Sequence, residues 1–325
     1  MNQAQRLRKS IESCELQHLA FKEQLDVLTR YIEDARDGFA SRIEWIVGPS
    51  RVGKSMLLNA LARANPESKP DGKRQVPVLV VPVLPNISPL LLPSSVLSAL
   101  GVPLQQKGLT SGVMFNRMVD QLRLAATRVL LFEEASHLVE PGARVPPRAA
   151  GDWFKSLADA LNITIMLFGV PRLAKLFESN EQLRLRASAK REFRPYDYRS
   201  PSDQKAFASC VRTYVDLFSE FGWPIELPLK LLVTQCYLLT GGLVGVLSKF
   251  MQELASQLRY EARRPLTMED FRLAAGAIEA AGHPDFPAFV RSEVSPIELT
   301  TAHAYVLETN GMSMNRIVSP SGDAR

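Results

Sequence analysis

Between residue 17 and about residue 200, short apolar runs alternate with longer amphipathic stretches. The apolar runs are rich in β-branched residues and are bounded by glycine, proline or charged residues, which is typical of strands buried on both faces of a parallel sheet. The strands that this pattern predicts are Ile43–Val47, Val78–Val81, Val129–Phe132, Ile163–Phe168 and a short fifth one at Arg191–Phe193.

Helical periodicity fills most of the segments between these runs. Apolar residues at near-helical spacing across 17–36 predict an amphipathic helix ahead of the first strand. Further helices are expected at Lys54–Ala62, 89–100, 111–126 and Trp153–Leu161, with a proline-rich loop at Glu140–Pro147. Because helices alternate with strands, the sequence predicts an α/β fold with a parallel sheet flanked by helices.

The pattern changes after about residue 200, beyond which only helices are indicated, at 202–220, 227–239, 243–262 and 267–281. We therefore expect an N-terminal helical segment (1–40), an α/β core (41–198), a helical subdomain (199–282) and a tail (283–325). The last residues of the tail, 319–325, are expected to be disordered, since chain ends are often poorly ordered unless they are tied down.

Composition narrows the class of protein. Of the 325 residues, 46% are apolar and 22% are charged, as in ordinary globular proteins. No apolar run reaches the ~18 residues of a membrane-crossing helix, and the start of the chain has no apolar signal core. Cys14, Cys210 and Cys236 are too far apart to predict a disulfide framework or a zinc site. We expect a cytoplasmic protein with no membrane partner, whose net charge of +5 permits nucleic-acid binding without demonstrating it.

A phosphate-binding pattern connects the first strand to the helix that follows it. The segment Gly48-Pro49-Ser50-Arg51-Val52-Gly53-Lys54-Ser55 fits G-x-x-x-x-G-K-[ST], and Met56 completes the expected contact set. Glycine lets successive backbone N–H groups turn toward phosphate oxygens, and the helix N-terminus adds its positive dipole end. Lys54 would contact the β and γ phosphates, and the Ser55 hydroxyl would bind magnesium. The sequence therefore predicts ATP and Mg²⁺ as cofactors.

Two adjacent carboxylates, Glu133 and Glu134, follow the third predicted strand. Hydrolysis of a triphosphate requires one acidic group near the metal and one that orients the attacking water. Adjacent strand residues point to opposite faces, so the pair can divide these tasks. We assign Glu133 to the magnesium shell and Glu134 to the water. Two solvated carboxylates at a helix start are the alternative, since negative charge is favoured there.

Several motifs occur in the order found in AAA+ ATPases, and within that group the chain resembles the transposon-encoded ATP-binding regulators of the TniB/TnsC type. The resemblance extends over about residues 20–280. It rests on the stretches Gly48–Ser55, Phe132–Leu138, Asp152–Leu157, Leu167–Pro171, Asn180–Arg186 and Leu239–Gly245. It implies an AAA+ core of P-loop NTPase type with a C-terminal helical lid.

The resemblance also implies a function. Such proteins assemble on duplex DNA as ATP-dependent rings or helical filaments and link a target-selecting protein to the transposase, and ATP hydrolysis drives their disassembly. Their subunits associate head to tail, so that an arginine of one reaches the nucleotide of the next. We expect Arg186 to be this arginine finger, with Arg184 as second choice. The implied DNA contacts are Lys107, Thr110 and Arg117.

The chain departs from the family pattern at three positions. Glu133 stands where Asp is usual, the fourth strand ends in Gly169-Val170 without an evident polar sensor, and Val246 occupies a position where many AAA+ proteins carry a sensor arginine. These departures suggest slow hydrolysis and keep open a nucleotide-gated scaffold with little turnover. A replication initiator or helicase loader is a further alternative, although roughly 40 residues after residue 284 are short for an additional DNA-binding domain.

Overall fold

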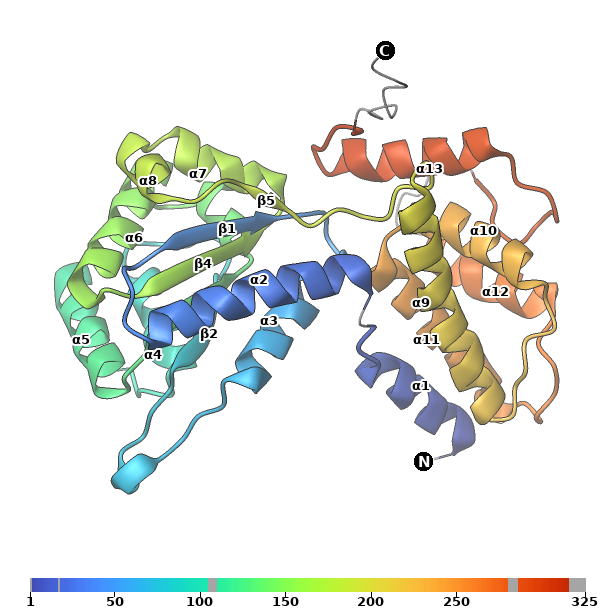
Figure 1. Cartoon of the computed structure of the whole chain (residues 1–325), viewed down its shortest axis with the longest axis horizontal. Coiled ribbons are helices and arrows are strands. Elements are labelled where there is room, and N and C mark those ends of the chain that lie inside the picture. The colour runs from blue at the N-terminus through green and yellow to red at the C-terminus, as the bar shows by residue number, and fades with distance from the viewer. Residues whose placement is uncertain (1, 17, 105–109, 280–285, 316–325) are drawn as a thin grey trace, which may run out of the picture. The chain divides into compact units, whose positions relative to one another are not determined.

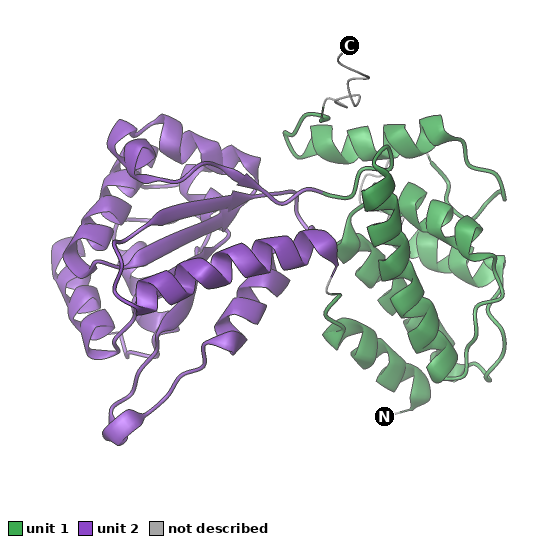
Figure 2. Cartoon of the chain, viewed as in Figure 1, with its two compact units in different colours: residues 1–16, 195–325 green, residues 17–194 purple. Residues whose placement is uncertain are grey.

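The computed structural model describes residues 2–16, 18–104, 110–279 and 286–315, and the chain divides into two compact units (Figure 2). An α/β unit comprises residues 17–194, and a helical unit comprises residues 1–16 together with 195–325. The segment 1–40, expected to be one helical segment, is thus divided between the two units. Helix α1 (Gln3–Ser13) belongs to the helical unit because its Ala4, Leu7 and Ile11 are buried in its packing against α11 and α9.

The α/β unit alternates strands and helices (Figure 1). Its strands are β1 (Ile43–Val47), β2 (Val78–Pro82), β3 (Val129–Glu133), β4 (Thr164–Gly169) and β5 (Arg191–Glu192). Its helices are α2 (Leu19–Arg36), α3 (Lys54–Ala64), α4 (Leu91–Ala99), α5 (Ser111–Leu124), α6 (Pro147–Leu161), α7 (Ala174–Glu178) and α8 (Glu181–Arg186). Short 3-10 turns are η1 (Pro70–Gly72), η2 (Ala135–Val139) and η3 (Pro171–Leu173).

The sheet has the strand order β2-β3-β4-β1-β5, and every pair is parallel. Each predicted strand forms within one or two residues of its expected bounds. Helices α2 and α3 cover one face, and α4 and α6 lie against the other, where α5 packs on both of them. All of β4 and the first four residues of β3 are buried, as expected for strands with helices on both faces. The α/β fold with a parallel sheet is therefore confirmed.

Helix α6 differs from its expected bounds. It begins at Pro147, six residues before Trp153, inside the segment predicted as a loop. Proline breaks a helix interior, but its fixed φ and missing N–H suit the first turn of a helix. The two consecutive prolines, Pro146 and Pro147, therefore mark the N-terminus of α6.

The helical unit contains α9 (Pro201–Glu220), α10 (Leu229–Thr240), α11 (Val244–Gln257), the turn η4 (Leu258–Tyr260) and α12 (Met268–Glu279). It also contains α13 (Pro296–Thr309), which lies in the segment expected to be a tail. A capping box between Ser295 and Glu298 starts this helix, and Leu299, Ala302 and Val306 are buried. The disorder expected at 319–325 lies outside the described residues.

No single described helix has the length and hydropathy needed to span a bilayer. Among the described helices, one pair passes the same test when taken together: α10 with α11 and η4, across a bend of 111°.

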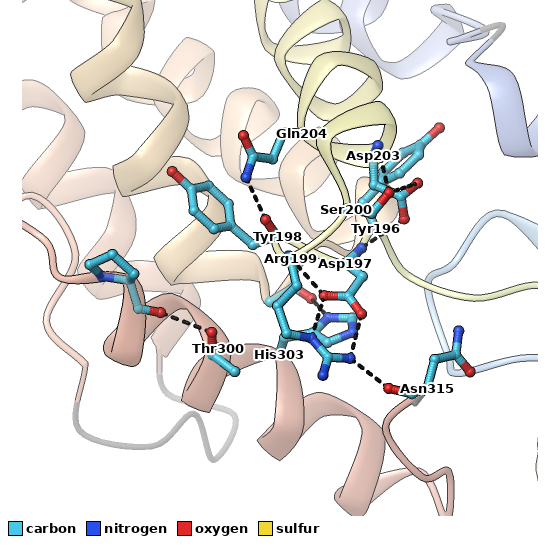
Figure 3. A network of polar contacts seen from close by, with 12 residues as sticks. Tyr196, Asp197, Tyr198, Arg199, Ser200, Asp203, Gln204, Thr300, His303 and Asn315 are labelled. Atoms are coloured by element: carbon cyan, nitrogen blue, oxygen red, sulfur yellow. Dashed lines mark hydrogen bonds and ion pairs between the residues drawn. The ribbon is translucent and has the colours of Figure 1, made fainter. Parts of the chain in front are cut away.

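A polar network links the segment Tyr196–Ser200 to Asp203 and Gln204 of α9 (Figure 3). Hydrogen bonds of Tyr196 also help to fix the turn between α10 and α11. The backbone N–H of Tyr196 donates to the Gly242 carbonyl at 3.1 Å, and the Tyr237 hydroxyl donates to the Tyr196 carbonyl at 2.6 Å. Nδ1 of His303, on α13, lies 2.9 Å from the Gly241 carbonyl oxygen. Gly242 has a φ of +90°, and a Cβ there would lie 2.2 Å from the Tyr196 carbonyl oxygen. The network therefore requires glycine at this turn of the helical unit.

Candidate nucleotide-binding site

The phosphate-loop segment lies at the carboxyl end of β1, beside the end of β4. The Gly48 N–H donates to the Gly169 carbonyl at 3.1 Å, so the loop starts as a continuation of the sheet. A Cβ on Gly48 would lie 2.3 Å from the Phe193 carbonyl oxygen, which explains the glycine. Arg51 and Gly53 have positive φ values of 64° and 115°, which turn the chain sharply before α3. The expected strand, loop and helix are therefore all present.

Lys54, the first residue of α3, is only 7% exposed. Its Nζ donates to the carbonyl oxygens of Gly48 and Pro49, both at 2.8 Å. Helix α3 begins without a side-chain cap, so its first N–H groups can bind an anion. A buried ammonium beside uncapped helix amides is a donor set that fits the phosphates of a nucleotide.

The acidic pair lies within electrostatic reach of Lys54. Burial lowers the pKa of the Lys54 ammonium to about 8, and the negative charges of Glu134 and Glu133 act in the opposite direction. The structure thus brings these predicted residues together. The Ser55 hydroxyl and the Glu133 carboxylate, the two predicted magnesium ligands, are oxygen donors of the kind that Mg²⁺ prefers. No group of three His, Cys, Asp or Glu side chains able to hold a metal occurs among the described residues, so a bound Mg²⁺ would also need phosphate oxygens or water as ligands.

ATP affinity should fall as the pH rises above about 8, the pKa of buried Lys54. Phosphate oxygens favour the charged ammonium, so nucleotide binding raises the lowered pKa of Lys54. Above the pKa of the free protein, binding therefore requires the uptake of a proton. The ATP affinity then falls by up to roughly tenfold for each further pH unit. At about pH 6 the ammonium is charged in both states, so Lys54 contributes no pH dependence there.

Calorimetric titration with ATP at about pH 9, in two buffers of different ionisation enthalpy, measures this proton uptake. Lys54→Arg is the control, since a guanidinium stays charged at this pH. Equal binding heats in the two buffers for the unmodified chain would contradict the prediction.

Glu134 adopts a left-handed backbone conformation, with φ 54° and ψ 37°, immediately after β3. For a residue other than glycine this conformation has an energy roughly 1–2 kcal/mol above the right-handed one. Such strain concentrates at functional sites, where the surrounding structure holds it. Here the Val83 N–H donates to the Glu133 carbonyl at 2.9 Å, which fixes the end of β3 just before the bend. The Glu134 side chain is exposed, so water has access to its carboxylate, as the predicted role requires.

Ser136 is a buried polar residue beside the candidate site, and the sequence reasoning assigned it no position there. A Cβ on Gly169 would lie 2.3 Å from Ser136 Oγ, so this hydroxyl fills the space beside the end of β4 where no polar sensor was evident. Ser136 Oγ accepts a hydrogen bond from the Val170 N–H at 2.7 Å. The next residue, His137, contacts the end of β2, since its Nδ1 lies 2.7 Å from the Val83 carbonyl oxygen. The available signal was the polar residue between the acidic pair and His137.

The two finger candidates differ in their surroundings on α8. The Asn180 side chain accepts from the Leu183 N–H at 2.9 Å and caps this helix. Arg186 forms an ion pair with Asp159 of α6. Arg184 is exposed, and its side chain has no hydrogen bond or ion pair with any described residue. Arg184 is therefore the freer of the two.

The predicted DNA contacts have structural partners where they are described. Thr110 caps α5 by accepting a hydrogen bond from the Val113 N–H at 3.3 Å. Arg117 is half-buried and donates to the Pro103 carbonyl at 3.0 Å. Lys107 lies outside the described residues. The DNA-binding role of these residues stays a prediction.

A family model described as "Bacterial TniB protein" matches residues 15–194, more than half of the chain. The chain belongs to the TniB family. The matched region contains the phosphate loop, the acidic pair and both finger candidates. With the AAA+ fold, this membership makes the chain an ATPase of the AAA+ type. No curated protein matches it.

Solved structures with the same fold include ORC and Cdc6 proteins. The ORC2 protein of Aeropyrum pernix, solved as ADPNP–ADP complexes, is 16% identical to this TniB-family chain, with a TM-score of 0.60. The match covers 84% of this chain and 72% of the ORC2 chain. Cdc6p from Pyrobaculum aerophilum is 12% identical, with a TM-score of 0.62 over 93% and 83%. The A. pernix ORC1 protein in complex with DNA is 14% identical, with a TM-score of 0.54 over 91% and 79%. At these identities the likeness establishes the fold, including a C-terminal helical region.

Proposed function

We propose that this TniB-family ATPase is a DNA-binding regulator of transposition that assembles on duplex DNA when it holds ATP and Mg²⁺. It links a target-selection protein to the transposase, and ATP hydrolysis drives its release from DNA. The observation that carries the proposal is the TniB match over residues 15–194, which encloses a phosphate loop and an acidic pair that lie together. The presence of DNA in one structure of the same fold supports the DNA-binding part. We place this activity in the cytoplasm.

The site residues have separate tasks in this function. Lys54 would turn from the loop carbonyls to the phosphates, and the Ser55 hydroxyl and the Glu133 carboxylate would hold the metal. Magnesium, when bound, neutralises phosphate charge and aligns the leaving group. Glu134 orients the attacking water from its exposed position. The charge that develops in the transition state then requires an additional cation, which a neighbouring subunit supplies.

Arg184 is the better candidate for this cation. Arg186 forms an ion pair with Asp159, which would have to break before Arg186 could reach a neighbouring site. An arginine that acts across a subunit boundary requires a head-to-tail interface, which closes into a ring or propagates as a helix. This geometry accounts for the proposed assembly along DNA.

Arg184→Ala should lower DNA-stimulated ATP hydrolysis by a factor of about 100 or more, since arginine fingers contribute strongly to phosphoryl transfer. Mixing this variant with Glu134→Gln should restore part of the activity, because the Glu134→Gln subunit can supply Arg184 to an intact neighbouring site. Phosphate release measures both effects. Arg186→Ala is the matched control, and a mixture that stays inactive would contradict action of Arg184 in trans.

Electron microscopy tests the function as a whole. The full chain should form rings or filaments on duplex DNA with a non-hydrolysable ATP analogue and Mg²⁺, and should not form them with ADP. Adding ATP in place of the analogue should give assemblies that dissociate as phosphate is released. Absence of any association with duplex DNA in the presence of the analogue would refute the proposal.

A nucleotide-gated scaffold with little turnover is the second candidate. Ser136 fills the place beside Gly169 and is hydrogen-bonded to the Val170 N–H, and Val246 is buried at 8% exposure where an arginine sensor would be needed. Glu133 is also one methylene longer than the usual Asp. Phosphate release measured with DNA and the transposition partners decides between the two, since a scaffold should assemble without releasing phosphate.

A further inference from the structure

A polar cavity lies at the amino ends of β2 and β3, on the edge of the sheet opposite the phosphate loop. Its volume is about 540 Å³, and its lining includes the side chains of Arg36, Asn65, Gln75 and Arg128. Arg36 Nη1 donates to Asn65 Oδ1 at 3.2 Å, which holds one guanidinium at the cavity wall. Arg128 is exposed immediately before β3. The cavity is therefore lined by two cationic side chains, Arg36 and Arg128, and lies away from the candidate nucleotide-binding site.

A projecting ribbon, residues 66–75, borders this cavity and extends away from the body of the α/β unit (Figure 1). Two backbone hydrogen bonds between Ser68 and Gln75, of 3.0 and 2.8 Å, pair its two arms. The turn η1 closes its tip, with Asp71 and Gly72 at positive φ. Every residue from 66 to 74 is exposed. The ribbon thus has a defined shape and presents its side chains to solvent.

The ribbon and cavity together carry a positive surplus. Arg74 donates to Glu67 at 2.8 Å, so these two charges offset each other. Lys69 and Lys73 are exposed, and neither forms an ion pair with a described residue. Asp71 is the other acidic side chain of the ribbon. With Arg36 and Arg128 added, this surface, which we call the basic edge, has five cations against the two anions Glu67 and Asp71, a net charge of +3.

We propose that the basic edge binds the phosphate backbone of duplex DNA without reading its sequence. Exposed lysine and arginine side chains that form no ion pair can neutralise phosphates and release their counterions. No exposed large hydrophobic side chain occurs in residues 66–75, so the surface lacks the apolar anchors of a protein interface. The inference rests on the proposed DNA-binding function and names a contact face for it, separate from Thr110 and Arg117.

The test is a salt titration of DNA binding by the full chain. A variant with Lys69→Gln, Lys73→Gln and Arg128→Gln removes three unpaired cations from the basic edge. With Mg²⁺ and a non-hydrolysable ATP analogue, its affinity for a labelled random duplex should fall at least tenfold at about 0.1 M salt. The slope of log affinity against log salt should become shallower by roughly 2–3, since each lost phosphate contact contributes about 0.9.

Two controls make the result specific. Lys22→Gln, Arg30→Gln and Lys175→Gln remove the same charge from other exposed positions of the α/β unit and should leave the slope unchanged. Lys69→Arg, Lys73→Arg and Arg128→Lys keep the charge and should retain binding. Thermal melting and ATP affinity of the glutamine variant should match those of the unmodified chain.

The failures of the two proposals are distinguishable. If the unmodified chain binds duplex DNA and the basic-edge variant binds with the same affinity and salt slope as its control, the basic edge is not a contact face, and the proposed function stands. If the unmodified chain binds no duplex DNA with the ATP analogue, both proposals fall.

Discussion

Replacing Lys54 with alanine should weaken ATP binding by roughly 100-fold or more and abolish ATP-dependent assembly on DNA, since two charge-assisted contacts of about 1.5–3 kcal/mol each are lost. The Lys54 ammonium is already held at the loop by two carbonyls, each 2.8 Å away, so little ordering is needed when it turns to the phosphates. Alanine supplies neither charge nor donor. Binding of a fluorescent ATP analogue and DNA pull-down with ATP measure the two losses.

Lys175→Ala is the matched control for this substitution, because Lys175 is an exposed lysine on α7 of the same unit. It should leave nucleotide binding unchanged. A melting temperature of Lys54→Ala close to that of the unmodified chain would show that the loss comes from the site. ATP binding by Lys54→Ala at undiminished affinity would mean that the nucleotide does not occupy this loop.

The sheet was predictable because its strands are buried on both faces. Val129–Phe132 and Ile163–Phe168 are continuous apolar runs, as expected of strands in a helix-covered parallel sheet, where both faces are removed from water. The phosphate loop was predictable because its turn needs a backbone conformation that glycine adopts readily, such as the φ of 115° at Gly53. In both places a local pattern in the sequence was enough to predict the element.

The parts that depend on distant contacts were not predictable. Helix α1 is amphipathic, but its local sequence does not predict which element covers its apolar face. In the structure Leu7 and Ile11 are buried and α1 packs on α11, far along the chain. Ser136 is a polar residue beside an acidic pair, and its relation to Gly169 depends on how β3 and β4 lie side by side. The ion pair of Arg186 with Asp159 likewise joins two helices. Each case is a tertiary contact that no local pattern encodes.

Glu134→Gln should reduce ATP hydrolysis by about 100-fold or more while ATP binding is retained, since a positioned general base contributes roughly 10²–10⁴-fold. Glutamine keeps the length of the side chain and can adopt the left-handed backbone conformation at about the same energetic disadvantage as glutamate. It cannot accept a proton from water. The negative charge of Glu134 lies near Lys54 and would repel an anionic nucleotide. Its removal should therefore not weaken nucleotide binding.

Glu133→Gln separates the two carboxylates. If Glu133 holds the metal, this variant should require a higher Mg²⁺ concentration for half-maximal activity, whereas Glu134→Gln should stay inactive at every Mg²⁺ concentration. In the proposed cycle, DNA-bound assemblies of Glu134→Gln should persist with ATP, because release depends on hydrolysis. Phosphate release and the lifetime of DNA complexes, measured on the same samples, test this link directly. Dissociation of Glu134→Gln assemblies at the rate of the unmodified chain would show that hydrolysis does not drive release.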